Sequence, residues 1–560
     1  MKRQNKAIVA AGVSVGILAA ALGVVAILSP RALRLLWRGD VRELRPGARH
    51  ERRTPSQRPR LLVLALDGVD RALLYELLRD GSLPRFAAIL GGRQGTRFPH
   101  ACLYDRLVTV LPSTTIAAWT TVFTGTPPGV HGITGNELFA RDEGEMLAPA
   151  PVSFDDLSPT LAVYTDDMIG RRLDVPTVYE KLRERDPPIR IWVAMSQIYR
   201  GADRLLLAKA SVLAEVFGAF LREELADATA RGVYAELDEA VIEGVIEAVE
   251  SDELPDVLTV YLAGTDLFTH HADVGPDEAR RGYLREVLDP LLGRLGEALD
   301  RRGFFDDTYT VVLSDHGHTE VLHDERHALG TKGPDEPPEL LRRLGYRVRP
   351  FAWKVDASDD YQAVLAYNGA MAFVYLANRE GCKERGQRCD WSLPPRLRED
   401  VLPVADAFAR ASAEGAGFPA LRGKLDMVLV RSEGADPYLV YTGGGNLEQV
   451  DTYLASHPHP SYVDVASRLR DMGSGPHGDH AGDIVLIAQN GNVDDPADRY
   501  YFASKYRSWH GSPSRQDSEV PLIVAHPRRS TDELSAVTTE VFGDEPRMHR
   551  VAELLLRLRS

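Results

Sequence analysis

Short, continuous apolar runs recur along the sequence, and several of them end in polar residues. Such runs are typical of strands that are buried on both faces of a sheet. Segments with a helical pattern lie between them, including residues 228–251 and 277–303. This alternation predicts an α/β fold with a mostly parallel sheet and helices on both of its faces. The five runs are RLLVLALDGVD (60–70), DVLTVYLAGTD (256–266), TYTVVLSDHG (308–317), GDIVLIAQNG (482–491) and VPLIVAHP (520–527).

Three of these runs have polar residues at or near their carboxyl ends, which is where a ligand is expected to bind. In open α/β sheets, ligands bind beyond the carboxyl ends of the strands. Asp67 lies near the end of the first run and Asp266 ends the second, while Asp315 and His316 come near the end of the third. A single aspartate at a strand end is typical of a turn or a helix cap. Three at one sheet edge, with histidines close by, favour a shared site.

Residues 330–480 are richer in proline and glycine and less regular than the rest of the chain. We interpret them as an insertion or cap on a catalytic domain that spans residues 60–560. Together with residues 138–200, the insertion is expected to shape a substrate pocket. No repeat with a period of 20–50 residues stands out, so a repeat architecture is not expected.

The N-terminal region has a different pattern. A short basic segment, residues 1–6, precedes residues 7–28, and these 22 residues contain no charge. They exceed the roughly 20 apolar residues needed to cross a hydrocarbon core. A cleavable secretory signal, the alternative, has an apolar region of only about 7–15 residues before a small-residue cleavage site. The run therefore predicts an uncleaved, single-pass transmembrane anchor.

Charge is distributed unevenly along the chain. Residues 1–60 carry 13 Lys/Arg and 3 Asp/Glu, and since the whole chain has a net charge of −15, the remainder carries −25. Such an acidic body repels nucleic-acid phosphates, so no nucleic-acid binding is expected. The Arg/Pro-rich linker, residues 29–59, is read either as a contact for anionic lipid head groups or as a solvated tether.

The orientation of the anchor is less clear from the charges. Basic residues flank the anchor on both sides, so their count does not favour export of the catalytic domain. Long domains nevertheless translocate regardless of charge, and we place the catalytic domain outside the cytoplasm.

The chain has three cysteines. Cys382 and Cys389 are close enough in sequence to close a small loop, and a disulfide there would fit an oxidising compartment. A reduced pair is equally compatible with this spacing. Cys102 is left over and is expected to be buried. The oligomeric state is left open by the sequence.

Histidines and aspartates at short spacings indicate a metal site. Asp266 and His270 are four residues apart, which brings both side chains to one face of a helical turn. Asp315 and His316 leave a strand end together, and His510 lies in a glycine-containing loop before the last apolar run. Carboxylate and imidazole ligands suit zinc or a similar divalent ion.

The segment LPSTTIAAWTTVFTG (111–125) places Thr114 and Thr115 after a proline and before an apolar run. A threonine there can cap a helix, and beside a divalent cation its hydroxyl can also act as a nucleophile. The two roles are compatible, because a helix start offers N–H groups and a favourable dipole to an anionic phosphoryl group. We take Thr115 as the nucleophile and keep two alternatives, a cap without catalytic function and Thr114 as the nucleophile.

The order of these segments resembles the alkaline phosphatase superfamily, and the closest similarity is to its type I phosphodiesterase/nucleotide pyrophosphatase branch. The resemblance runs from about residue 60 to the C-terminus but is dense in only five segments. They are, in order, the strand ending in Asp67, Pro-Ser-Thr-Thr with TGTPPGVHGI (124–133), Asp266-x-x-x-His270, Ser-Asp315-His316-Gly, and His510-Gly.

The resemblance implies an alkaline phosphatase-like core with two divalent metal ions. Zinc is the expected ion and Mn²⁺ the alternative. Thr115 matches the nucleophile, which also bridges toward the second metal, and a covalent phosphothreonine intermediate follows. His131 matches a motif histidine that we take as structural. The ligand sets implied by the resemblance are Asp266, His270 and His510 for one ion and Asp67, Asp315 and His316 for the other.

The resulting expectation is a membrane-anchored hydrolase that cleaves phosphodiester or pyrophosphate bonds of a small phosphoester. A phosphomonoesterase or phospho-group transferase of the same superfamily is the alternative. An inactive, metal-stabilised binding ectodomain is the alternative from another class. A sulfatase is disfavoured, because neither Cys102 nor Ser113 lies in a C/S-x-P-x-R context. Asn368 is a candidate substrate-binding residue, although an asparagine before glycine is typical of a turn.

Overall fold

The computed structural model describes residues 41–45, 58–154, 156, 158–220, 227–356 and 359–560. The basic segment, the expected transmembrane anchor at 7–28 and most of the linker lie outside these ranges. Within them, no helix has the length and apolar character needed to cross a membrane.

The larger of the two main sheets has eight strands among the described residues, in the order β1-β7-β6-β8-β2-β9-β18-β3. The five strands from β7 to β9 are parallel, whereas β1 is antiparallel to β7, and β18 is antiparallel to both β9 and β3. The mostly parallel sheet predicted from the apolar runs is therefore confirmed. The strands are β1 (Val41–Glu43), β2 (Arg60–Leu66), β3 (Ala101–Tyr104), β6 (Ile191–Ala194), β7 (Arg204–Leu206), β8 (Val257–Leu262), β9 (Thr308–Ser314) and β18 (Leu522–Ala525).

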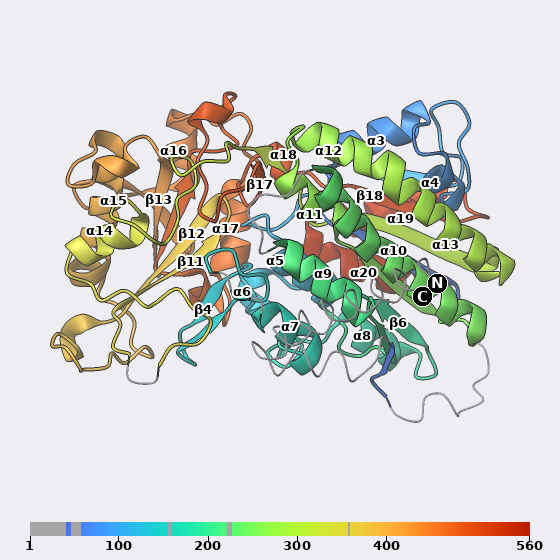
Figure 1. The fold of residues 1–560 in the computed structure, drawn as a ribbon, viewed down its shortest axis with the longest axis horizontal. Helices are drawn as coiled ribbons and strands as arrows, with labels where there is room; N and C mark the ends of the chain where they lie inside the picture. The colour runs from blue at the N-terminus through green and yellow to red at the C-terminus, as the bar shows by residue number, and fades with distance from the viewer. Residues whose placement is uncertain (1–40, 46–57, 155, 157, 221–226, 357–358) are drawn as a thin grey trace, which may run out of the picture.

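Helices pack on this sheet in two groups. One group includes α10 and α13, which pack against each other and lie in front of the sheet in Figure 1. In the other group, α20 packs on α5, α8 and α19. Both groups contribute to one apolar core with the buried strands. The helices used below are α5 (Thr115–Thr124), α7 (Ser158–Asp166), α8 (Val178–Arg185), α9 (Ala210–Phe220), α10 (Asp227–Ser251), α11 (Gly264–His271), α12 (Pro276–Tyr283), α13 (Asp289–Arg301), α19 (Thr531–Phe542) and α20 (Val551–Leu558).

The region interpreted as an irregular insertion contains a second sheet, six-stranded and antiparallel, on the left in Figure 1. Apolar clusters cover both faces of this sheet. The run at 482–491, expected in the main sheet, supplies its strand β16 instead. This expectation was wrong because an apolar run reports burial but does not specify its partner strands. The strands are β11 (Ala363–Asn368), β12 (Met371–Leu376), β13 (Leu425–Arg431), β14 (Tyr438–Gly443), β15 (Asn446–Gln449) and β16 (Ile484–Ala488).

The cysteines resolve the alternative that the sequence left open. Cys382 and Cys389 form a disulfide in the loop that follows β12. Cys102 lies on β3 and is a buried free cysteine, as expected.

Candidate metal and catalytic site

Three adjacent strands end at the same edge of the main sheet and deliver the acidic residues there. Leu66 at the end of β2 pairs with Leu262 of β8 on one side and with Ser314 of β9 on the other. Asp67 follows β2 directly, and Asp315 follows β9. The parallel register therefore brings these carboxylates together, as the positions of the apolar runs predicted.

The helix α11 begins directly after β8 and carries two further site residues. Its N-terminus is held by a buried carboxylate from α10, since Gly264 N donates to Asp238 Oδ1 at 3.1 Å. Tyr283 on α12 donates to the other oxygen of Asp238 at 3.0 Å. A Cβ at Gly264 would lie 1.9 Å from the Tyr283 hydroxyl oxygen, so only glycine allows this packing. One turn further on, His270 Nε2 lies 3.4 Å from Asp266 Oδ1.

The residues predicted as metal ligands form two clusters of three, which we call the β8 trio and the β2/β9 trio. In each trio, one ligand atom from each residue lies within 4.8 Å of the others, and all six residues are buried. The trios are adjacent, because the rings of His316 and His510 stack with their centroids 3.6 Å apart. The β8 trio is Asp266, His270 and His510, and the β2/β9 trio is Asp67, Asp315 and His316.

The three histidines of the trios share one orientation. Each Nδ1 faces a backbone carbonyl: His270 that of Ser508 at 2.8 Å, His510 that of Ser113 at 2.8 Å, and His316 that of Gly317 at 3.0 Å. A carbonyl can only accept, so Nδ1 carries the proton and the lone pair of Nε2 faces the site. Histidines that bind metals are commonly held in this way.

Unpaired carboxylate oxygens support the assignment of a cation site. Asp67 Oδ1 and Asp315 Oδ2 are buried and have no hydrogen-bond partner among the described residues. Burial, together with repulsion from Asp315 and Asp266, raises the pKa of Asp67 well above its ordinary value. Buried carboxylates that face one another without a partner are costly, and a cation between them removes this cost. The donor set therefore fits divalent cations.

Thr115 is the first residue of α5 and lies at the edge of the site. Its Oγ1 is 3.1 Å from Nε2 of His316. Thr114 precedes the helix as its N-cap residue but makes no side-chain capping bond, and its Oγ1 has no partner among the described residues. Of the two threonines, it is therefore Thr115 whose hydroxyl contacts a trio.

Two residues that sequence reasoning missed lie in this site. His318 Nε2 is 2.9 Å from Asp266 Oδ1, and it forms a further possible ligand cluster with Asp266 and His316. Its Nδ1 lies 3.1 Å from the hydroxyl oxygen of Ser508, which itself donates to a backbone carbonyl. Asn136 is the second, since it lines the pocket beside Thr115 and its Oδ1 accepts from the N–H of Ile116 at 3.0 Å.

Asn368, the candidate substrate-binding residue, is fully buried at the end of β11. Its Oδ1 accepts from the N–H groups of Asn136 and Glu137, at 2.7 and 3.2 Å, and its Nδ2 donates to the Glu137 carbonyl at 3.0 Å. Its amide thus holds the loop that carries Asn136. His131 is buried away from both trios, with Nε2 2.9 Å from Thr121 Oγ1. This position agrees with the structural role expected from the sequence.

The loop that carries His510 is joined to the loop after β9 by Asp517. One oxygen of this carboxylate accepts from the backbone N–H and the hydroxyl of Ser512, at 3.0 and 2.6 Å. The other oxygen accepts from Thr319 Oγ1 at 2.7 Å, and the Asp517 carbonyl accepts from Gly317 N at 3.0 Å. Asp517 therefore fixes the position of the histidines on two separate loops.

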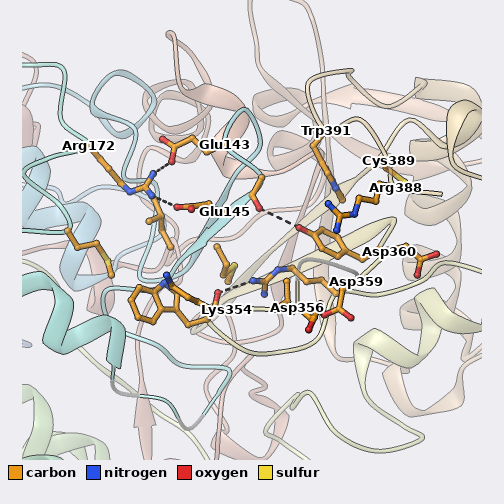
Figure 2. Close-up of a pocket in the computed structure, with 18 residues that line it drawn as sticks. Glu143, Glu145, Arg172, Lys354, Asp356, Asp359, Asp360, Arg388, Cys389 and Trp391 are labelled. Atoms are coloured by element: carbon orange, nitrogen blue, oxygen red, sulfur yellow. Dashed lines mark hydrogen bonds and ion pairs between the residues drawn. The ribbon is translucent and has the colours of Figure 1, made fainter. Parts of the chain in front are cut away.

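A pocket of about 180 Å³ opens beside Thr115, between the trios and helices α7, α9, α10 and α11. A second pocket, of about 530 Å³, lies beside the second sheet and contains no residue of either trio (Figure 2). Two of its four cationic side chains have partners: Arg172 pairs with Glu143 and Glu145, and Arg349 donates to nearby backbone carbonyls. The pocket beside Thr115 is therefore the candidate substrate site.

No curated protein sequence matches this chain. Solved structures that are similar include murine ectonucleotide pyrophosphatase/phosphodiesterase 5, in an inactive form complexed with AMP, at 14% identity and a TM-score of 0.48. That alignment covers 89% of this chain and 94% of the other. Phosphonoacetate hydrolase from Sinorhizobium meliloti 1021, in complex with phosphonoacetate, has 18% identity and a TM-score of 0.46, covering 89% and 96%.

The sequence comparison with protein families gives a direct assignment. Residues 61–386, more than half of the chain, match the family described as type I phosphodiesterase/nucleotide pyrophosphatase. This range begins at β2 and includes Thr115 and the residues of the trios except His510. The chain therefore belongs to the type I phosphodiesterase/nucleotide pyrophosphatase family and is a metal-dependent hydrolase of phosphoric esters.

Proposed function

We propose that the protein is a phosphodiesterase that uses Thr115 as a covalent nucleophile at a site for two zinc ions. The observation that carries this proposal is the position of Thr115 Oγ1, 3.1 Å from His316 in the β2/β9 trio and at the start of a ten-residue helix. The β8 trio would hold one ion and the β2/β9 trio the other. When bound, the ions would supply Lewis-acid stabilisation of negative charge on the reacting oxygens.

The chain's own groups account for the reaction in two steps. Thr115 Oγ1 attacks phosphorus, the bond from phosphorus to the leaving ester oxygen breaks, and the departing alcohol carries away a proton. Water then displaces the phosphoryl group from Thr115, and the threonine hydroxyl is restored. The N-terminus of α5 favours the negative charge of the bound phosphoryl group. Asn136 is held through its Oδ1, which leaves its NH₂ group to donate to a phosphoryl oxygen.

A diester is the favoured substrate because of the charges around the pocket. Its described lining residues include no lysine or arginine. A monoester carries an additional negative charge, which a cationic side chain would have to balance. Arg507, which is close in sequence to His510, pairs with Asp273 and is not among the residues that line the pocket. A singly charged phosphodiester therefore matches the site better than a monoester does.

The proposed reaction is tested with purified full-length protein and three 4-nitrophenyl substrates: a phosphodiester, a phosphomonoester and a sulfate ester. Each is assayed with added Zn²⁺, with added Mn²⁺ and after chelation. We expect the diester to be hydrolysed fastest, the sulfate ester to be unreactive, and chelation to abolish turnover. Elemental analysis should find about two metal ions per chain. Absence of diester hydrolysis with either metal would reject the proposal. Faster hydrolysis of the monoester than of the diester would indicate that the protein is a phosphomonoesterase instead.

The apolar run at 7–28 supports a further part of the proposal, a single-pass anchor with the catalytic domain outside the cytoplasm. The full-length protein should then stay in the membrane fraction after a carbonate wash. Protease added to intact cells should digest the catalytic domain. Release of a soluble form cut near residue 28 would show that the run is a cleaved signal, and protection from protease would place the domain inside.

A further inference from the structure

The pocket beside Thr115 has an apolar wall in addition to the trio residues. Helices α7, α9, α10 and α11 and the residue after β6 supply this wall. Apart from the trio residues Asp67, Asp266, His270 and His510, none of its described lining residues is charged or a histidine. The side chains that we call the apolar wall are Val163, Met195, Leu213, Val216, Leu237 and Leu267.

Helix geometry and backbone hydrogen bonds fix the positions of side chains in the apolar wall. Leu213 and Val216 lie three residues apart, which places them on one face of α9, and both are at most 5% exposed. Met195 directly follows β6 and has a φ of 56°, a region that side chains other than glycine rarely adopt. Two hydrogen bonds hold it there, because its carbonyl accepts from the Tyr164 hydroxyl and its N–H donates to Leu206, both at 2.9 Å.

Three polar side chains line this side of the pocket: Thr160, Tyr164 and Gln197, whose Oε1 is buried and has no hydrogen-bond partner among the described residues. The Tyr164 hydroxyl is used by the Met195 carbonyl and is therefore not a free donor. The described residues that line the pocket contain no cation to receive a second phosphate. Its one tryptophan, Trp509, is in contact with the ring of His270, with centroids 4.4 Å apart. A substrate with a second phosphate thus finds no complementary lysine or arginine among the described lining residues.

The volume of the pocket beside Thr115 is consistent with binding of a small apolar group. Pockets that enclose drug-sized ligands usually measure about 300–1,000 Å³, whereas an apolar cavity of about 150 Å³ suffices for benzene. At about 180 Å³, the pocket has room for a group of roughly benzene size, such as a short aliphatic chain.

We propose that the pocket selects phosphodiesters with an aliphatic group, which the apolar wall receives while the phosphoryl group meets Thr115. This inference rests on the proposed phosphodiesterase function and names its substrate class. The driving force is the removal of CH₂ groups from water, which is proportional to the apolar area buried. Selectivity should therefore increase with chain length until the pocket is full.

The test uses purified full-length protein and 4-nitrophenyl alkyl phosphodiesters with methyl, butyl, hexyl and decyl groups. The nucleoside analogue thymidine 5′-(4-nitrophenyl phosphate) releases the same leaving group and serves as the competing class. We expect kcat/KM to rise about fourfold for each CH₂ added up to hexyl, to level off afterwards, and to be lower for the nucleoside ester than for hexyl. Equal rates along the series, or a preference for the nucleoside ester, would overturn the inference.

Two substitutions on α9 test whether the chain-length preference arises in this pocket. Val216→Phe fills the pocket and should shift the preferred chain to a shorter one. Ser211→Phe adds the same ring at an exposed position of the same helix and should leave the preference unchanged. An identical preference in the wild type and Val216→Phe would show that the chain binds elsewhere and would overturn the inference.

A binding measurement separates this inference from the proposed reaction. Calorimetry on the zinc-loaded Thr115→Ala variant compares hexyl methyl phosphate with dimethyl phosphate, so no turnover is required. We expect the hexyl ester to bind at least tenfold more tightly and with a negative heat-capacity change. Equal affinities would overturn the inference even if diesters are hydrolysed. Selective binding without any hydrolysis in the wild type would support the inference and reject the proposed reaction.

Discussion

Oγ1 of Thr115 lies 3.1 Å from Nε2 of His316, although the two residues are 201 positions apart in the chain. Thr115 reaches this point because it begins α5, and His316 reaches it because it follows β9 at the edge of the main sheet. The contact joins the candidate nucleophile to the β2/β9 trio. It also gives the two threonines of the Pro-Ser-Thr-Thr segment different environments.

Thr115→Ala should lower kcat by at least about 10³-fold, as expected when a covalent nucleophile is removed. The bound metal and the melting temperature should change little, because the substitution leaves both trios intact. The measurement pairs steady-state kinetics with elemental analysis of the same preparation. Mass spectrometry after rapid acid quenching of a reaction with 4-nitrophenyl methyl phosphate should find a methylphosphoryl group on Thr115 in the wild type.

Thr114→Ala is the matched control for this prediction. The Thr114 side chain makes no capping bond to α5 and is buried like that of Thr115. We expect this variant to keep kcat within about tenfold of the wild type. A larger loss in Thr114→Ala than in Thr115→Ala would move the nucleophile to Thr114, and near-normal activity in both would rule out a threonine nucleophile.

His318→Ala should weaken metal binding by about 10- to 100-fold, the usual effect of losing a group that supports a ligand. The reason is the 2.9 Å contact between His318 Nε2 and Asp266, a residue of the β8 trio. Competition with a zinc chelator measures the affinity directly. His526→Ala removes a buried histidine beyond β18, near Asp307 and away from the trios, and should leave the affinity unchanged. Equal affinities in both variants would exclude a role for His318.

The sequence predicted the site best where local geometry is sufficient. Asp67 and Asp315 follow adjacent parallel strands, and Asp266 and His270 share a helical face, so strand ends and helical spacing identify them. His318 was missed because its position depends on a contact with Ser508 from a distant loop. The signal that could have found it is the second histidine of the LSDHGH segment.

Asn136 and the second sheet show where such reasoning stops. Asn136 comes to the pocket because the amide of Asn368, 232 residues later, holds its backbone. No local pattern encodes this pairing. The run at 482–491 was recognised as a buried strand, but its neighbours β12 and β13 belong to the second sheet. The choice between two sheets depends on long-range packing, which a periodicity does not report.

Asp517→Ala should reduce both kcat and metal affinity by about 10- to 100-fold, because the carboxylate joins the His510 loop to the loop after β9. The variant leaves the backbone N–H of Ser512 without its acceptor, which should also lower the free energy of unfolding by about 1–3 kcal/mol. Asp517→Asn keeps one oxygen acceptor and should recover part of each loss. Kinetics at saturating zinc separate the two effects, and an unchanged metal affinity in Asp517→Ala would contradict the role assigned to this residue.

Asp238 makes the stability of the protein depend on pH in a defined direction. Burial raises its pKa from 3.8 to about 7, so the folded protein binds a proton that the unfolded chain releases between about pH 4 and pH 7. The stability contributed by this proton is complete below about pH 4 and is lost as the pH rises through 7. The slope approaches about 1.4 kcal/mol per pH unit within this interval.

Asp238→Asn keeps an oxygen to cap α11 but cannot titrate. We therefore expect the free energy of unfolding of the wild type to fall relative to this variant from pH 5 to pH 7, and the difference to stay constant above about pH 8. Urea unfolding at four pH values measures it, with Asp300→Asn, at an exposed position of α13, as the control for the loss of one formal charge. Parallel curves for the wild type and Asp238→Asn would contradict a raised pKa at this buried carboxyl.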